Sequence, residues 1–143
     1  MNNKISVNTA VILTESALGC TLSKVANKEI LFEGVLKNGE SIGFCSPWSK
    51  YHSPGRFWVD ITLEQYKVME RFIHGIFFFR LEGECMLLVG WPELKKYLIN
   101  DALKYNENEG YHWKLHIYRD YVEVLGWREN VCYWLVGRNL KSI

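Results

Sequence analysis

Two apolar runs in the middle of the chain constrain its fold more than any other feature. Residues 76–82 read IFFFRLE, residues 85–91 read CMLLVGW, and Gly83-Glu84 separates them. Each run has the length of a strand and falls well short of the roughly 18 apolar residues that span a membrane. We therefore predict a hairpin over 76–91. Because both of its strands are apolar on both faces, we expect them at the centre of a sheet.

Other strands are predicted from turn residues and alternation. Residues 29–37 and 40–45 flank Asn38-Gly39, a pair preferred in type I′ hairpin turns. Residues 57–61 form a third strand. In 111–118, apolar Tyr111, Trp113, Leu115 and Ile117 alternate with polar side chains, which predicts a half-buried strand. Residues 121–127 and 131–136 complete an antiparallel meander at the C-terminus.

Three helices are predicted around these strands. Residues 8–26 carry apolar positions at helical spacing; this helix stops at Asn27, and the β-branched run 9–12 can delay its start to Thr14. Thr62-Leu63-Glu64-Gln65 is a capping box that opens a second helix, with Gly75 as its end. Pro92 begins the third. The second helix buries Tyr66, Met69 and Phe72 or Ile73, and the third buries Leu94, Tyr97, Leu98 and Ala102.

The fold class that follows is α+β, as one domain over residues 1–143. We expect a mostly antiparallel sheet of about seven or eight strands with three helices. The 143 residues suit a single core, and the sequence shows neither a repeat nor a linker.

Composition limits the classes of binding partner and the cellular location that we expect. Seventeen Lys and Arg against sixteen Asp and Glu give a formal charge of +1, so the chain has no global field for a phosphate backbone, and nucleic acid would need a local patch. The N-terminus lacks the pattern of a signal peptide, which predicts a cytoplasmic protein. The four cysteines, far apart and among apolar neighbours, predict reduced buried thiols rather than a zinc knuckle.

Histidine and serine motifs give no catalytic signature. His112 and His116 are spaced for one metal ion on a helix, but along a strand they lie roughly 13 Å apart, so we expect two histidines facing solvent or a partner. His74 is expected as a cation near the end of the second helix. Nucleophile elbows and phosphate-binding glycine loops are absent from the sequence.

The order helix, hairpin, strand, helix, hairpin over residues 10–100 resembles the core of PD-(D/E)XK nuclease-like proteins. In that family, an acidic residue and an ExK triplet on adjacent strands hold a divalent cation. Here the corresponding strand reads GFCS over 43–46, and the literal ExK triplet, residues 93–95, falls in a predicted helix. The resemblance therefore implies either a non-catalytic relative or a diverged nuclease or phosphoesterase, whose available groups are Glu33, Glu40, Asp60 and Lys50.

Residues 46–58, SPWSKYHSPGRFW, are the most distinctive segment, predicted as a loop. Its rings can simply fold back over the sheet. They can also stack on a planar ligand while the basic side chains bind its negative charge. Gly55, after Pro54, is expected to form a tight turn.

The leading hypothesis is a non-enzymatic binding protein, without cofactor or metal, that recognises an anionic planar ligand such as a nucleotide, or a macromolecular partner. The predicted contacts are Trp48, Lys50, Tyr51, His52, Arg56 and Trp58. A cation-dependent nuclease or phosphoesterase is the alternative. A third hypothesis is an inhibitory protein-interaction module, or a homo-oligomer, that uses the aromatic C-terminal meander: Trp113, Tyr118, Tyr121, Trp127, Tyr133 and Trp134.

Overall fold

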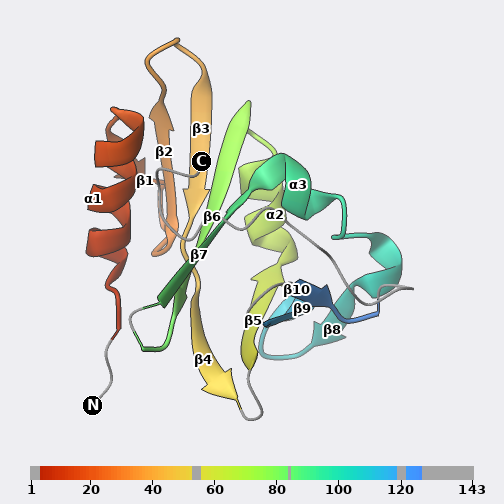
Figure 1. The fold of residues 1–143 in the computed structure, drawn as a ribbon. Helices are drawn as coiled ribbons and strands as arrows, with labels where there is room; N and C mark the ends of the chain where they lie inside the picture. The colour runs from red at the N-terminus through yellow and green to blue at the C-terminus, as the bar shows by residue number, and fades with distance from the viewer. Residues whose placement is uncertain (1–3, 53–55, 84, 119–121, 127–143) are drawn as a thin grey trace.

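The computed structural model describes residues 4–52, 56–83, 85–118 and 122–126 (Figure 1). The helices there are α1 (Val7–Leu18), α2 (Leu63–Met69) and α3 (Trp91–Lys95), with a 3₁₀ turn at Asn100–Ala102. The strands are β1 (Leu22–Lys24), β2 (Leu31–Val35), β3 (Ser41–Cys45), β4 (Trp48–His52), β5 (Arg56–Thr62), β6 (His74–Leu81), β7 (Cys85–Gly90), β8 (Lys104–Asn106), β9 (Gly110–Ile117) and β10 (Val122–Val124).

The strands form one mixed sheet of ten, in the order β1-β2-β3-β6-β4-β5-β9-β10, with β7 paired to β6 and β8 to β9. The predicted α+β class and three helices are confirmed, but the sheet is larger and not wholly antiparallel, because β3 and β4 both run parallel to β6. An apolar or alternating pattern predicts a strand but not the strand with which it pairs. The short strands β1 and β8, and also β4, lack such a pattern and are not among the predicted strands.

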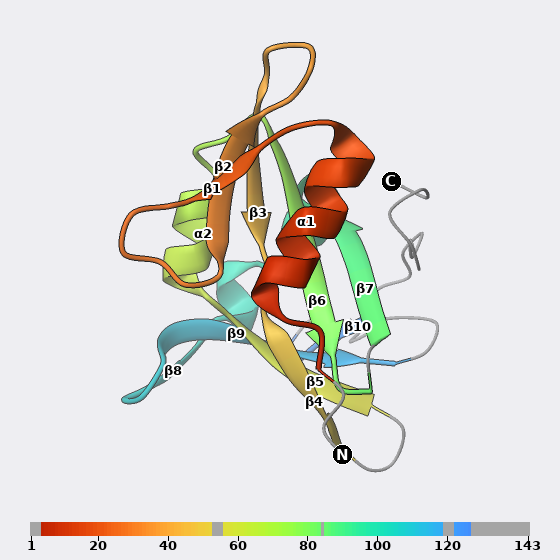
Figure 2. The ribbon, with the colours of Figure 1, turned by 90° about the vertical axis from the view of Figure 1, so that its left-hand side faces the viewer.

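The predicted central hairpin is confirmed as β6 and β7, and β6 is apolar on both faces. Ile76 and Phe78 pack in one cluster with α1, whereas Phe77 and Phe79 pack in another with Trp91 of α3. Figures 1 and 2 show α1 on one side of the sheet and α2 and α3 on the other. Burial on both faces explains why this run is apolar throughout.

Helix boundaries correct several sequence expectations. The first helix begins at Val7, where Ser6 caps it, and ends at left-handed Gly19. Asn27 is also left-handed, but it lies in the turn before β2. The capping box at Thr62 is confirmed, yet α2 ends at Met69, after about two turns, and Gly75 belongs to β6. The third helix is likewise shorter than predicted and does not reach Ala102.

The hairpin between β2 and β3 is confirmed, but its turn is not type I′. Gly39 has φ +88°, while Asn27 is the sole non-glycine residue with positive φ among those described. Asn38 instead accepts the backbone N–H of Glu40 through its side chain. A single left-handed glycine is typical of a three-residue hairpin loop.

At the C-terminal end, β9 and β10 confirm part of the predicted meander. The predicted strand at 131–136 and the tight turn at Pro54-Gly55 lie outside the described residues. Cys20 and Cys45 are free thiols, and Cys45 is buried. No helix within the described part of the chain is long and apolar enough to cross a membrane.

Arg80 of β6 holds the junction between β3 and β4. Its guanidinium, 4% exposed, donates to the carbonyl oxygen of Ser46 from Nε (3.1 Å) and Nη2 (2.9 Å), and to that of Ile5 from Nη1 (3.1 Å). The Arg80 backbone N–H also donates to the Pro47 carbonyl at 2.9 Å. Buried charge is tolerated only when its donors are satisfied, and here backbone carbonyls satisfy them.

Replacement of Arg80 by Ala is expected to lower the free energy of unfolding by about 3 kcal/mol, because the Ser46 and Ile5 carbonyls lose a charged donor inside the protein. Urea denaturation of both proteins measures this difference. The exposed Arg71→Ala is the matched control and should change stability by less than about 0.5 kcal/mol. Equal stabilities for the two variants would contradict this role of Arg80.

Candidate functional site

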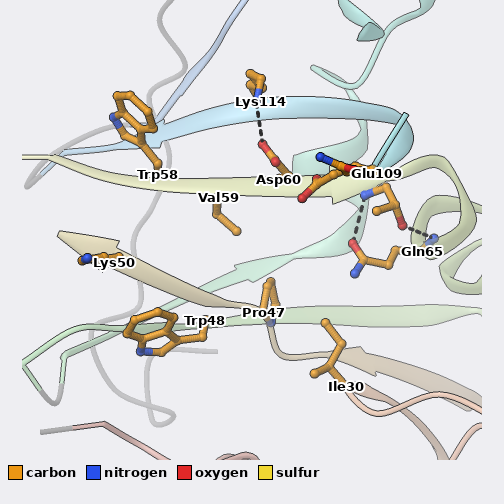
Figure 3. Close-up of a pocket in the computed structure, with 12 residues that line it drawn as sticks. Ile30, Pro47, Trp48, Lys50, Trp58, Val59, Asp60, Gln65, Glu109 and Lys114 are labelled. Carbon is orange, nitrogen blue, oxygen red and sulfur yellow. Dashed lines mark hydrogen bonds and ion pairs between the residues drawn. The ribbon is translucent and has the colours of Figure 1, made fainter. Parts of the chain in front are cut away.

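A cleft of about 630 Å³ opens where β4 leaves β6 and joins β5 (Figure 3). Trp48 and Ser49 pair with β6, whereas residues 50–52 pair with residues 56–58 of β5. Beyond Trp58, β5 pairs only with β9 on the described ladders. The two parts of the sheet therefore diverge, and Pro47 and Ile30 lie in the gap between them.

Of the six predicted contact residues, Trp48, Lys50 and Trp58 line this cleft. They stand on a hairpin, not on the predicted loop, since Lys50 is paired directly with Trp58. His52 pairs with Arg56 and lies on the same face as Lys50, two residues away.

Tyr51 belongs to the opposite face of the hairpin. It is paired with Phe57, and their rings meet edge to face at 5.4 Å between centroids. Phe57 packs against the hydrophobic core. The structure thus brings five of the six predicted residues to one face and separates Tyr51 from them.

Trp58 is the middle ring of a stack of three. The His52 ring, on β4, lies 4.2 Å from the Trp58 ring at 20°, and the His116 ring, on β9, lies 5.3 Å away at 19°. Arg56 also approaches this indole, with its guanidinium carbon 5.6 Å from the ring centroid. Imidazoles from the strands on either side thus cover the faces of Trp58, so Trp48 is left as the ring that can stack on a ligand.

The other end of the cleft carries charge. Asp60, two residues along β5 from Trp58, pairs across the ladder with Lys114 of β9, and their charged atoms are 3.4 Å apart. Glu109 approaches Asp60 from the turn before β9 (Figure 3). The pKa of Glu109 is raised above its ordinary value, first by its hydrogen bond with Asp60 and then by burial and the Asp60 charge. Asp60 therefore contacts both an acidic side chain, Glu109, and a basic one, Lys114.

His112 completes this charged end. Together with Asp60 and Glu109 it offers three ligand atoms that all lie within 4.8 Å of one another. The expectation that His112 faces solvent or a partner is wrong, because it is 1% exposed. The strand prediction itself is confirmed, so His112 and His116 stand opposite different residues of β5 and do not share a site.

The carboxylates proposed from the nuclease resemblance do not converge. Asp60 belongs to the cluster, but within the described part of the chain neither Glu33 nor Glu40 joins it. Glu33 is exposed on β2, and Glu40 bonds His74 at 2.9 Å. That contact lowers the pKa of Glu40. The prediction that His74 lies near the end of the second helix is wrong, because His74 is the first residue of β6.

The sequence analysis missed Glu109, His112 and Lys114 as partners of Asp60. The signal available was the alternation of 111–118, which places residues 112, 114 and 116 on one face. Alternation does not show which strand pairs with 111–118. The contacts of these residues with Asp60 of β5 therefore could not be predicted from the sequence.

Comparison with family models, with curated proteins and with solved structures finds no match to this chain. The function of the cleft is therefore argued from its own geometry.

The pKa of His116 is lowered, first by burial, although its hydrogen bond with Glu123 (3.0 Å) opposes the shift. As pH falls below about 6.5, the unfolded chain binds the proton before the folded one does. We therefore expect this imidazole to reduce stability progressively with falling pH until the pH reaches its folded-state pKa.

Glu123→Gln is expected to lower the pKa of His116 further, because the neutral amide no longer favours the imidazolium. A histidine NMR titration measures this pKa, with Glu107→Gln, in the turn at the far end of β9, as the control that leaves it unchanged. A higher pKa in the Glu123→Gln protein would show that the contact does not act electrostatically.

Proposed function

We propose that this protein binds a nucleotide-like anion in the cleft between β4 and β5, with the negatively charged group at Lys50 and the planar group beside Trp48. Both side chains line the cleft, and its volume of about 630 Å³ falls within the range of small-molecule sites. Asp60 neutralises the other basic side chain that lines the cleft, Lys114, through their ion pair.

The observation that carries this proposal is the state of Lys50. It is exposed within the cleft wall, and among the ion pairs found between described residues it takes part in none. An ammonium group with three donors and no ion-pair partner among the described residues is suited to a phosphate or carboxylate. A charged hydrogen bond of this kind contributes about 1.5–3 kcal/mol.

Trp48 supports the planar part of the ligand. Its ring lies in the cleft wall, and the Lys4 ammonium covers it at 4.7 Å from the centroid. A cation over an indole fixes the ring from one side. Stacking of a base on a tryptophan contributes about 1–3 kcal/mol and tolerates different bases.

Besides Lys50, two donors on the β4–β5 hairpin also lack partners among the described residues, one in an indole and one in a guanidinium. The buried Trp48 Nε1 and Arg56 Nε atoms have no acceptor among the described residues. Each unsatisfied buried donor costs about 1–3 kcal/mol. Of these two side chains only Trp48 lines the cleft, and a ligand rich in acceptor oxygens beside it would offset the cost for its indole, which favours an anion over an apolar molecule.

Isothermal titration with AMP, GMP, CMP and UMP in excess EDTA tests the proposal. We expect at least one nucleotide to bind, and Lys50→Ala to weaken that binding by about tenfold or more, because one charged hydrogen bond is lost. The same variant should bind the matching nucleoside as well as the unaltered protein does, since the nucleoside has no phosphate.

Lys37→Ala is the matched control, because Lys37 is an exposed lysine on the β2–β3 hairpin and does not line the cleft. It should leave nucleotide affinity unchanged. Absence of binding by all four nucleotides, or equal affinities for the two lysine variants, would refute the proposal.

A further inference from the structure

We propose that Asp60, Glu109 and His112 bind one divalent transition-metal ion of the Zn²⁺ class at the end of the cleft away from Trp48. This site is separate from the proposed nucleotide contacts, since none of Trp48, Lys50 and Arg56 belongs to it. Three ligand atoms lie close together there, and the histidine is buried with one ring nitrogen unpaired among the described residues.

His112 is oriented in the way that metal-binding histidines are. Its Nδ1 lies 2.9 Å from the Gly110 carbonyl oxygen. A carbonyl can only accept, so Nδ1 carries the proton and Nε2 of the neutral ring presents a lone pair. A hydrogen bond from one ring nitrogen to a backbone carbonyl, with the other nitrogen on the metal, is the usual second contact of a metal-bound histidine.

The Nε2 lone pair has no protein partner to explain it. The atom is buried, and no described residue forms a hydrogen bond with it. The whole His112 side chain is enclosed as well, since the residue is 1% exposed. A buried polar atom without a partner calls for an explanation. A metal ion bound by His112 together with the two acidic side chains of the cluster would supply one.

The distances suit a single ion after a small adjustment. The three ligand atoms lie within 4.8 Å of one another. Ligands at about 2.1 Å from a tetrahedral Zn²⁺ are roughly 3.4 Å apart, so the ligand atoms must approach one another by at most about 1.4 Å. Glu109 can make that movement, because it is exposed and lies in the turn between β8 and β9. Asp60 and His112 are held by paired positions on β5 and β9.

The donor set favours Zn²⁺ over Mg²⁺. One imidazole and two carboxylates combine nitrogen and oxygen ligands, as in zinc sites, whereas Mg²⁺ prefers oxygen ligands in octahedral geometry. Lys114 is the competing cation, at 3.4 Å from Asp60. This contact is longer than a strong charge-assisted hydrogen bond, and Lys114 is half-exposed, so its ammonium can turn to solvent as the ion binds.

Zn²⁺ titration of the full chain, without nucleotide, tests the site by calorimetry and native mass spectrometry. We expect one ion per chain, bound more tightly than Mg²⁺. Asp60→Asn, Glu109→Gln and His112→Gln should each weaken Zn²⁺ binding by about tenfold or more, and the exposed Glu107→Gln, two residues from Glu109, should not. Nitrogen NMR should show Zn²⁺ shifting Nε2 of His112 much more than Nδ1.

Equal Zn²⁺ affinity in the unaltered protein and the three ligand variants, or no preference for Zn²⁺ over Mg²⁺, would overturn the proposal. If His112→Gln fails to fold, Glu109→Gln decides the question, because the exposed Glu109 can be replaced without disturbing the core. The nucleotide titration is made in EDTA and the metal titration without nucleotide. Failure of either proposal is therefore seen independently of the other.

Discussion

The fold depends on one buried guanidinium. Arg80 of β6 bonds the Ser46 carbonyl twice, at the point where the chain passes from β3 to β4. Ser46 is itself fully buried and donates to the Phe78 carbonyl at 2.9 Å. These contacts hold β3 and the start of β4 against β6, and the rest of β4 then pairs with β5. Divergence of the two parts of the sheet follows, and the cleft is a consequence of that divergence.

The ladder between β5 and β9 then separates core from site. Residues 57–62 pair with residues 112–117, and side chains alternate between the two faces. One face carries Val59, Ile61 and their partners into the hydrophobic core. The other carries Trp58, Asp60 and Thr62, which lie opposite His116, Lys114 and His112. The apolar face anchors the ladder, so the polar face can hold unpaired and like-charged groups that a loop could not keep in place.

The sequence predicted some elements well because their signals are local. The run at 76–91, the capping box at Thr62 and Pro92 each depend on residues within a few positions, and the structure confirms each element. Predictions failed where one residue type has several uses. The sequence predicts Asn27 and Gly75 as helix ends, but the left-handed Asn27 lies in a turn, and Gly75 lies in β6, where an added Cβ would meet the Cβ of Trp91 at 2.7 Å.

The amino-acid sequence by itself determined the α+β class, the central apolar hairpin and the gathering of rings and cations between residues 46 and 58. Periodicity and turn chemistry carry that information, because they depend on neighbours along the chain. The three-dimensional fold alone shows that β3 and β4 run parallel to β6, that the Trp58 ring stacks with two imidazoles, and that Asp60 meets Glu109 and His112. Apart from the stacking of His52 on Trp58, those contacts join residues 32 to 58 positions apart. Strand pairing between such segments is set by the packing of the whole core rather than by any local pattern.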